Sequence, residues 1–174
     1  MKTRGQPSSP ATLSPSKWND MNSAQLEKAL SRAEENCRAH GARLTEKRKH
    51  ILQLLLQSNI PLSAYELATR YYDTLNETIP AMSVYRMLDF LVAEALAHKL
   101  NSANKYVACA HIACKHQHEV PQFLICDSCQ RVKEIGISHA IIDALESSVK
   151  KAGYVLSQPQ IELHCLCEHC AQAA

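Results

Sequence analysis

The sequence predicts an α+β fold in two parts, and three patterns support this. Four stretches with helical periodicity fill residues 22–94, and two short apolar stretches around a turn follow them, as in a winged helix-turn-helix. Beyond residue 109, short apolar segments accompany one amphipathic helix, which is typical of a small α/β domain. We therefore expect a winged helix-turn-helix over 22–109 and an α/β domain over 122–174, with a His/Cys-rich hinge loop at 110–121.

The N-terminal part carries start and stop signals for its helices. Ser23 can cap the first helix and Gly41 ends it, while Ser63 and Glu66 form a capping box for the third. Apolar stretches on both sides of residues 101–104 predict the hairpin of the wing. The expected helices are 22–39, 45–56, 64–72 and 83–94.

The fourth helix combines an apolar stripe with a polar N-terminal end. Arg86 lies opposite the stripe, and Ser83 and Tyr85 flank it near the start of the helix. The first turn therefore presents polar groups on a firmly anchored helix. The stripe consists of Val84, Met87, Leu88, Leu91 and Val92.

Three strands and one helix are expected in the C-terminal part. The segments "FLIC" (123–126) and "RVKEIGI" (131–137) predict a pair of strands, and "YVLSQPQIELHCL" (154–166) predicts a closing strand. An amphipathic helix ends near Gly153. Its apolar side is marked by Ile141, Ile142, Leu145 and Val149.

The composition points to a reducing compartment. No apolar run approaches the roughly 18 residues of a membrane span. Residues 1–21 are rich in Pro and Ser, lack the apolar centre of a secretory signal, and are expected to form a disordered arm. We therefore predict a cytoplasmic protein with no membrane partner. Eight cysteines then indicate metal or redox chemistry rather than disulfides.

Two Cys-x-x-Cys pairs stand in the C-terminal part. Zn²⁺ binds four thiolates in structural sites, and a two-residue gap lets one turn supply two of them. Cys126, Cys129, Cys167 and Cys170 therefore fit a single structural zinc site that ties the last strand to the first. Two separate redox pairs are the alternative, but a redox pair of the thioredoxin type opens a helix, whereas Cys126 lies between two predicted strands. Cys165 is the nearest substitute ligand.

A resemblance to a known family rests on motifs along nearly the whole chain. Taken together, "RLTEKRKHIL", "SAYELA", "SVYRMLDFLVAEALAHKL", "YVAC", "FLICDSCQRVKEI" and "HCLCEHC" resemble the ferric uptake regulator (Fur) superfamily, and within it the zinc uptake regulators. The resemblance implies a homodimer whose winged helices bind a palindromic A·T-rich DNA operator and whose C-terminal domains dimerise. It also implies about two Zn²⁺ per subunit, one structural and one regulatory in the hinge, and a zinc-loaded dimer that represses zinc uptake genes.

The resemblance also assigns ligands residue by residue. It places the structural zinc on the four cysteines already named. His116 is the fallback for the loop histidine of the regulatory site, and His164 is a second-tier metal ligand. A thiolate at Cys109 suits tetrahedral Zn²⁺ better than octahedral Fe²⁺, which argues against an iron or peroxide sensor of the same superfamily. The expected regulatory ligands are His98, Cys109, His118 and Glu134.

Basic charge in the N-terminal half fits a nucleic-acid partner. Residues 1–109 hold 14 Lys and Arg against 10 Asp and Glu, a net charge of +4, while residues 110–174 have a net charge of −2. The fourth helix is expected in the major groove, with Lys47 and Arg48 near the phosphates. The 64–72 helix has no evident acid–base pair for joining two dimers on one operator, so that pairing stays open. The expected DNA contacts are Arg43, Tyr65, Ser83, Tyr85 and Arg86.

Two other classes of function compete with a repressor. A thiol oxidoreductase or redox-switched chaperone would use the Cys-x-x-Cys pairs and would not bind DNA. A hydrolytic zinc enzyme would need an open zinc position beside a general base, and the sequence has no His-Glu-x-x-His motif. We therefore do not expect an enzyme.

Overall fold

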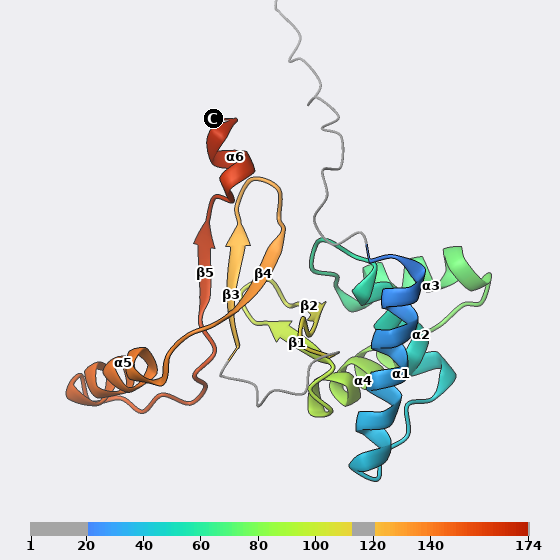
Figure 1. Ribbon diagram of the computed structural model, residues 1–174, viewed down its shortest axis with the longest axis horizontal. Coiled ribbons are helices and arrows are strands. Elements are labelled where there is room, and N and C mark those ends of the chain that lie inside the picture. The colour runs from blue at the N-terminus through green and yellow to red at the C-terminus, as the bar shows by residue number, and fades with distance from the viewer. Residues whose placement is uncertain (1–20, 113–120, 174) are drawn as a thin grey trace, which may run out of the picture.

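The computed structural model describes residues 21–112 and 121–173, and these form two units (Figure 1). Four helices and a two-stranded hairpin make the N-terminal unit, and a three-stranded sheet with two helices makes the C-terminal unit. The hairpin lies between the helices and the sheet (Figure 1). The predicted fold class is confirmed. The expected arm and most of the hinge loop lie outside the described residues, so the domain boundaries stay predictions.

The helices of the N-terminal unit begin and end at local signals. The side chain of Asn22 accepts a hydrogen bond of 2.8 Å from the backbone N–H of Gln25, so Asn22 caps the first helix instead of Ser23. The third helix runs past its predicted end until Asn76 adopts a left-handed conformation. No helix in the described parts of the chain has the length and apolarity to cross a bilayer. The four helices are α1 Ser23–Ala39, α2 Glu46–Leu56, α3 Ala64–Leu75 and α4 Ala81–Ala93.

The predicted wing forms as an antiparallel hairpin of β1 (Ala97–Leu100) and β2 (Lys105–Ala108). Tyr106 and Leu62 exchange two backbone hydrogen bonds of 2.8 and 2.9 Å, which join the hairpin to the segment just before α3. Both side chains are buried in the core of the helical unit. The wing is therefore fixed to the helices by backbone pairing as well as by packing.

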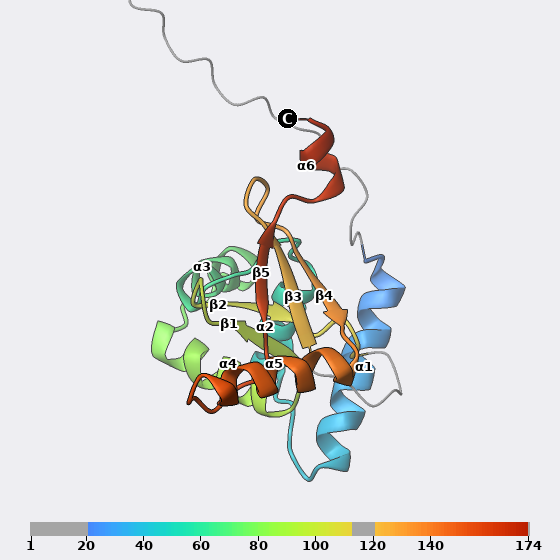
Figure 2. The same ribbon diagram turned by 90° about the vertical axis from the view of Figure 1, so that its left-hand side faces the viewer.

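The sheet of the C-terminal unit has the strand order β4–β3–β5. Strands β3 (Pro121–Cys126) and β4 (Val132–Gly136) pair antiparallel, whereas β5 (Glu162–Cys165) runs parallel to β3. The chain returns along β4, and α5 (His139–Lys151) with the segment after it then connects the end of β4 to the start of β5 on the other side of β3. A short helix, α6 (Glu168–Gln172), follows β5, and Figure 2 shows it beyond the end of the sheet.

The closing strand is shorter than the sequence predicts, because residues 154–161 form no strand. The buried side chain of Gln122 explains the difference. Its Nε2 donates to the carbonyl of Pro159 at 3.0 Å, and its Oε1 accepts from the N–H of Ile161 at 2.5 Å. Pro159 has no N–H to offer a strand ladder. The Gln122 side chain therefore binds this segment, and backbone bonding to β3 begins only at the carbonyl of Ile161, which accepts from the N–H of Phe123 at 3.0 Å.

The apolar core divides into two clusters. The larger cluster fills the helical unit, and a second joins Leu100 of the wing to Phe123 and Ile125 of β3. On α5, Ile142 is buried but Ile141 is 54% exposed, so the apolar side of this helix has little cover within the chain. Other large apolar residues exposed in this unit are Tyr154, Val155, Leu163 and Leu166.

The capping box of α3 predicts a pH-dependent contribution to stability. Glu66 accepts from the N–H of Ser63 at 2.7 Å and from Lys105 Nζ at 2.9 Å. The Ser63 backbone hydrogen bond, helped by Lys105, lowers the pKa of Glu66 to about 2 against the effect of burial. A lowered pKa means stability that is present above pH 4.5 and is lost as the pH falls toward 2.

We expect Glu66→Ala to lower the free energy of unfolding by about 1 kcal/mol at pH 7, because solvent screens this partly exposed carboxylate. The difference from the natural chain should be about halved at pH 3. Chemical denaturation at both pH values measures it. Asp73→Ala, on an exposed position of the same helix, is the control and should have no effect. A Glu66→Ala difference that is equal at both pH values would contradict the ionic origin.

Candidate metal centres and nucleic-acid interface

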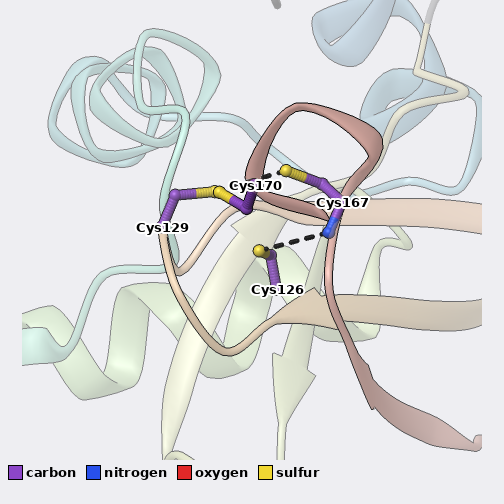
Figure 3. A group of neighbouring side chains, drawn as sticks. All are labelled: Cys126, Cys129, Cys167 and Cys170. Carbon is purple, nitrogen blue, oxygen red and sulfur yellow. Dashed lines mark hydrogen bonds between the residues drawn. The ribbon is translucent and has the colours of Figure 1, made fainter. Parts of the chain in front are cut away.

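Two turns of the C-terminal unit bring the four predicted cysteines together (Figure 3). Cys126 ends β3 and Cys129 lies in the β3–β4 turn, while Cys167 and Cys170 lie at the start of α6. Their sulfur atoms all lie within 4.8 Å of one another. Cys126 and Cys170 are buried, and the other two are partly exposed. The two Cys-x-x-Cys pairs therefore form one cluster, and neither is a separate pair.

The geometry and electrostatics of this cluster fit a zinc ion. Thiolates about 2.3 Å from a tetrahedral zinc lie about 3.8 Å apart, and Cys129 Sγ lies 3.8 Å from Cys167 Sγ. Backbone N–H groups of Cys129 and Cys167 donate to Cys126 Sγ and lower the pKa of that thiol to about 6. Burial raises the pKa of Cys129. The backbone therefore favours the thiolate form of Cys126, whereas burial opposes it at Cys129.

A second cluster joins the two units. His98 on β1, Cys109 just after β2 and Glu134 on β4 offer ligand atoms that lie within 4.8 Å of one another. Nε2 of His98 lies 3.5 Å from Oε2 of Glu134, and the Glu134 side chain is only 7% exposed. The thiol of Cys109 is buried as well. A nearly buried carboxylate beside imidazole and thiol is a donor set that suits Zn²⁺.

Sequence reasoning did not select His111, which also reaches this cluster. Its Nδ1 lies 3.0 Å from Oε1 of Glu134, and the N–H of Ala110 donates to Oε2 at 2.8 Å. The position of His111, two residues after Cys109, was the signal that could have found it. The expected loop ligands His116 and His118 lie outside the described residues, so their roles stay predictions.

His164 belongs to neither cluster. Its Nδ1 lies 2.8 Å from Oδ1 of Asp127, and both side chains are more than half exposed. Cys165, the substitute ligand considered for the structural site, directs its thiol to the carbonyl of Ile125 at 3.6 Å. Neither residue joins a group of three or more close donors among the residues the structure describes.

Helix α4 presents the predicted DNA contacts on its solvent side. Val84, Leu88 and Leu91 are fully buried, while Val92 is exposed near the end of the helix. Arg86 is exposed and lines an open depression between the starts of α2 and α4. Ser83, Lys47 and Arg48 also line this depression.

The two tyrosines predicted to contact DNA lie against each other. The rings of Tyr65 on α3 and Tyr85 on α4 meet edge to face with 6.3 Å between centroids. Tyr65 is 67% exposed, whereas Tyr85 packs partly against the core. Of the pair, Tyr65 offers the larger surface to a partner.

The basic residues before and within α2 differ in how many contacts their side chains make with the rest of the chain. Arg43 is exposed, and its carbonyl accepts a hydrogen bond of 2.9 Å from Arg48 Nη1. The Arg48 guanidinium also lies 3.7 Å from the ring centre of Phe90. Lys47 forms an ion pair with Glu77, in the loop before α4. Arg48 thus has a structural role in addition to its charge, which the sequence did not reveal.

The chain belongs to the ferric uptake regulator family, whose pattern it matches over residues 39–164. Among curated proteins it is 34% identical over 155 residues to the zinc uptake regulation protein of Escherichia coli (strain K12), covering 87% of this chain and 86% of that protein. The zinc uptake regulation protein of Shigella flexneri matches with the same identity and coverage.

Similar folds occur among solved structures. One is a zinc uptake regulator complexed with zinc and DNA, with a TM-score of 0.73 and 30% identity, covering 85% of this chain and 96% of that chain. Another is holo XcZur, with a TM-score of 0.67 and 38% identity, covering 83% of this chain and 97% of that chain. Both similarities extend over the helical unit and the C-terminal sheet, because neither unit alone accounts for such coverage.

Proposed function

We propose that this chain is a zinc-responsive transcriptional repressor of zinc uptake genes that acts in the cytoplasm and is not an enzyme. It binds a palindromic A·T-rich operator as a zinc-loaded homodimer. The observation that carries the proposal is the cluster of His98, Cys109 and Glu134, because its donors come from both the wing and the C-terminal sheet. A ligand held there connects metal binding to the position of the DNA-binding helix.

Cys126, Cys129, Cys167 and Cys170 are proposed to hold the structural zinc. Bound there, zinc supplies a cross-link between the β3–β4 turn and the start of α6. The convergence of both Cys-x-x-Cys pairs on one point favours this role over two redox pairs. The second core cluster is small, so such a cross-link contributes a large part of the stability of this unit.

His98, Cys109 and Glu134 are proposed to hold the regulatory zinc, with His118 as the expected fourth ligand. Cys109 favours zinc over iron, because a thiolate suits a tetrahedral site. The backbone N–H of Ala110 orients the Glu134 carboxylate. A bound cation connects Glu134 of the sheet to His98 and Cys109 at the wing, and this connection is lost when the cation leaves.

For DNA, α4 is proposed to enter the major groove with Arg86 and Ser83 toward the bases. Arg43 and Tyr65 are proposed to contact the DNA backbone, and Tyr85, whose ring packs edge to face against that of Tyr65, supports it. The Lys47–Glu77 pair holds the loop before α4 in position.

The function is tested with the purified dimer and DNA selected from a random-sequence library in the presence of zinc. We expect enrichment of A·T-rich palindromes, and tight binding that rises with free Zn²⁺ in a metal-buffered titration but not with Fe²⁺ or Mn²⁺ at their physiological levels. Equal binding with and without a chelator would refute the proposal. A reversible disulfide with no DNA selection would favour the redox alternative.

Cys129→Ser is expected to remove about one zinc per subunit and to unfold the C-terminal unit. The apparent free energy of a structural zinc, about 10–16 kcal/mol, matches or exceeds the whole stability of a typical domain, about 5–15 kcal/mol. Elemental analysis and size-exclusion chromatography measure both effects. Cys165→Ser is the matched control and should keep its zinc and its dimer. A zinc-replete Cys129→Ser dimer would exclude this ligand set.

Cys109→Ser is expected to keep the fold and the structural zinc while losing zinc-dependent operator binding. Loss of an outer-shell partner already costs roughly 10–100-fold in metal affinity, so loss of a direct ligand should exceed that range. The buffered zinc titration measures the change. His164→Ala, outside both clusters, should titrate like the natural chain. A Cys109→Ser protein with an unchanged zinc response would rule out this regulatory site.

Arg86→Ala should weaken operator binding by about 1–3 kcal/mol and relax base preference at one position if Arg86 contacts a base. Contact with a phosphate would instead weaken all sequences equally and reduce the salt dependence of binding. Competition assays at two salt concentrations distinguish the two. Arg32→Ala on α1, where Arg32 pairs with Glu35, is the control with the same loss of charge. An Arg86→Ala protein with the affinity of the natural chain would remove Arg86 from the interface.

A further inference from the structure

One carboxylate of the C-terminal sheet binds the turn of the wing. Glu162, the first residue of β5, accepts hydrogen bonds from the N–H of Asn101 at 2.6 Å, the N–H of Ser102 at 3.0 Å and the Ser102 hydroxyl at 2.5 Å. Hydrogen bonds to an ionised acceptor are about twice as strong as neutral ones. Burial works to raise the pKa of Glu162, but these donors outweigh it and lower the pKa.

Neighbouring residues extend this contact. Gln160 donates through Nε2 to the carbonyl of Lys99 and to Glu162 itself, both at 2.9 Å. Asn101 donates through its side chain to Gln158 at 3.4 Å. The side chains of residues 158, 160 and 162 thus all reach the wing between Lys99 and Ser102. Residues 158–162 therefore lie along the wing and contact it through polar side chains.

Glu162 is the second carboxylate of the sheet that contacts the wing, and it does so at a different point from the first. Glu134, on β4, meets the wing at His98, near the start of β1. Glu162, on β5, meets it at the turn beyond Leu100. Strands β4 and β5 lie on opposite sides of β3, so the two carboxylates hold the hairpin at separated points. A single point of attachment leaves every rotation of the wing free, whereas a second point leaves only rotation about the line that joins the two.

We propose that Glu162 is a positioning residue. Together with the cluster of His98, Cys109 and Glu134, it sets the orientation of the winged helix for operator binding, and its contact with Asn101 and Ser102 needs no metal. The inference rests on the proposed function. The arrangement in which this contact forms is similar to that of a relative solved with zinc and DNA, over 85% of this chain. The proposal assigns the contact to the DNA-binding arrangement, so its loss is expected to lower the fraction of dimers that fit the operator.

The test compares Glu162→Gln, Ser102→Ala and the double variant with the natural chain as full-length, zinc-loaded dimers. We expect each single variant to keep both zinc ions per subunit, and Glu162→Gln to bind the selected operator roughly tenfold more weakly at saturating zinc. The double variant should be no weaker than Glu162→Gln, because both changes remove one contact. Glu146→Gln, an exposed carboxylate on α5, is the matched control and should bind normally.

Hydrogen exchange provides the readout that a general loss of stability would not reproduce. In Glu162→Gln the amides of Asn101 and Ser102 should exchange faster, with or without zinc, while the amide of Tyr106 stays protected. Operator affinity equal to or above that of the natural chain in Glu162→Gln would overturn the proposal, as would strictly additive effects in the double variant. If Glu162→Gln does not fold, the test rests on Ser102→Ala. Operator affinity of Ser102→Ala equal to that of the natural chain would then overturn the proposal. Failure of the natural chain to bind DNA would refute the proposed function instead.

Discussion

The β1–β2 hairpin depends on three carboxylates that come from three other elements. Its strands are four residues long, too short to be stable as an isolated hairpin in water. Glu66 of α3 binds Lys105, Glu134 of β4 lies beside His98, and Glu162 of β5 accepts from the turn. Backbone pairing and packing fix the hairpin to the helices, and the contacts with Glu134 and Glu162 connect the sheet to it.

This dependence explains why a metal near the hairpin can act on a distant helix. Leu100 packs in the core of the sheet, while Ala97 and Tyr106 pack in the core of the helices. A shift of the sheet against the wing is therefore passed to the helices through packed side chains and through the Leu62–Tyr106 pairing just before α3. Coupling of this kind needs a continuous chain of contacts that can adopt two arrangements. The cluster of His98, Cys109 and Glu134 lies where the two cores adjoin.

Much of the fold was predictable because local signals and periodicity agree. The α3 capping box, the α4 stripe and the turn at 101–104 each depend on nearby residues, and all three appear in the structure. The convergence of the cysteines followed from ligand spacing alone. The short β5 could not be predicted, because it depends on Gln122, a side chain more than thirty residues away that takes over the hydrogen bonds of Pro159 and Ile161.

In the candidate sites as well, features that depend on sequence motifs could be predicted, whereas contacts between distant residues could not. Cys109 and Glu134 followed from motif resemblance, but the approach of His111 to Glu134 depends on how the chain turns after β2. Likewise, the stacking of Arg48 on Phe90 joins two helices and leaves no periodic trace in the sequence. Single basic residues therefore look alike in a sequence, although one packs on an aromatic ring and another faces solvent.

The sparse burial of α5 has a consequence for the life of a newly made chain. Ile142 alone is buried on this helix, and Ile141, Tyr154 and Val155 remain in water. Covering such surface by a second copy releases free energy that the lone subunit lacks. When few copies exist, the number of dimers is limited by how often two subunits meet. The fraction of chains able to repress at a given metal concentration therefore depends on the concentration of the protein.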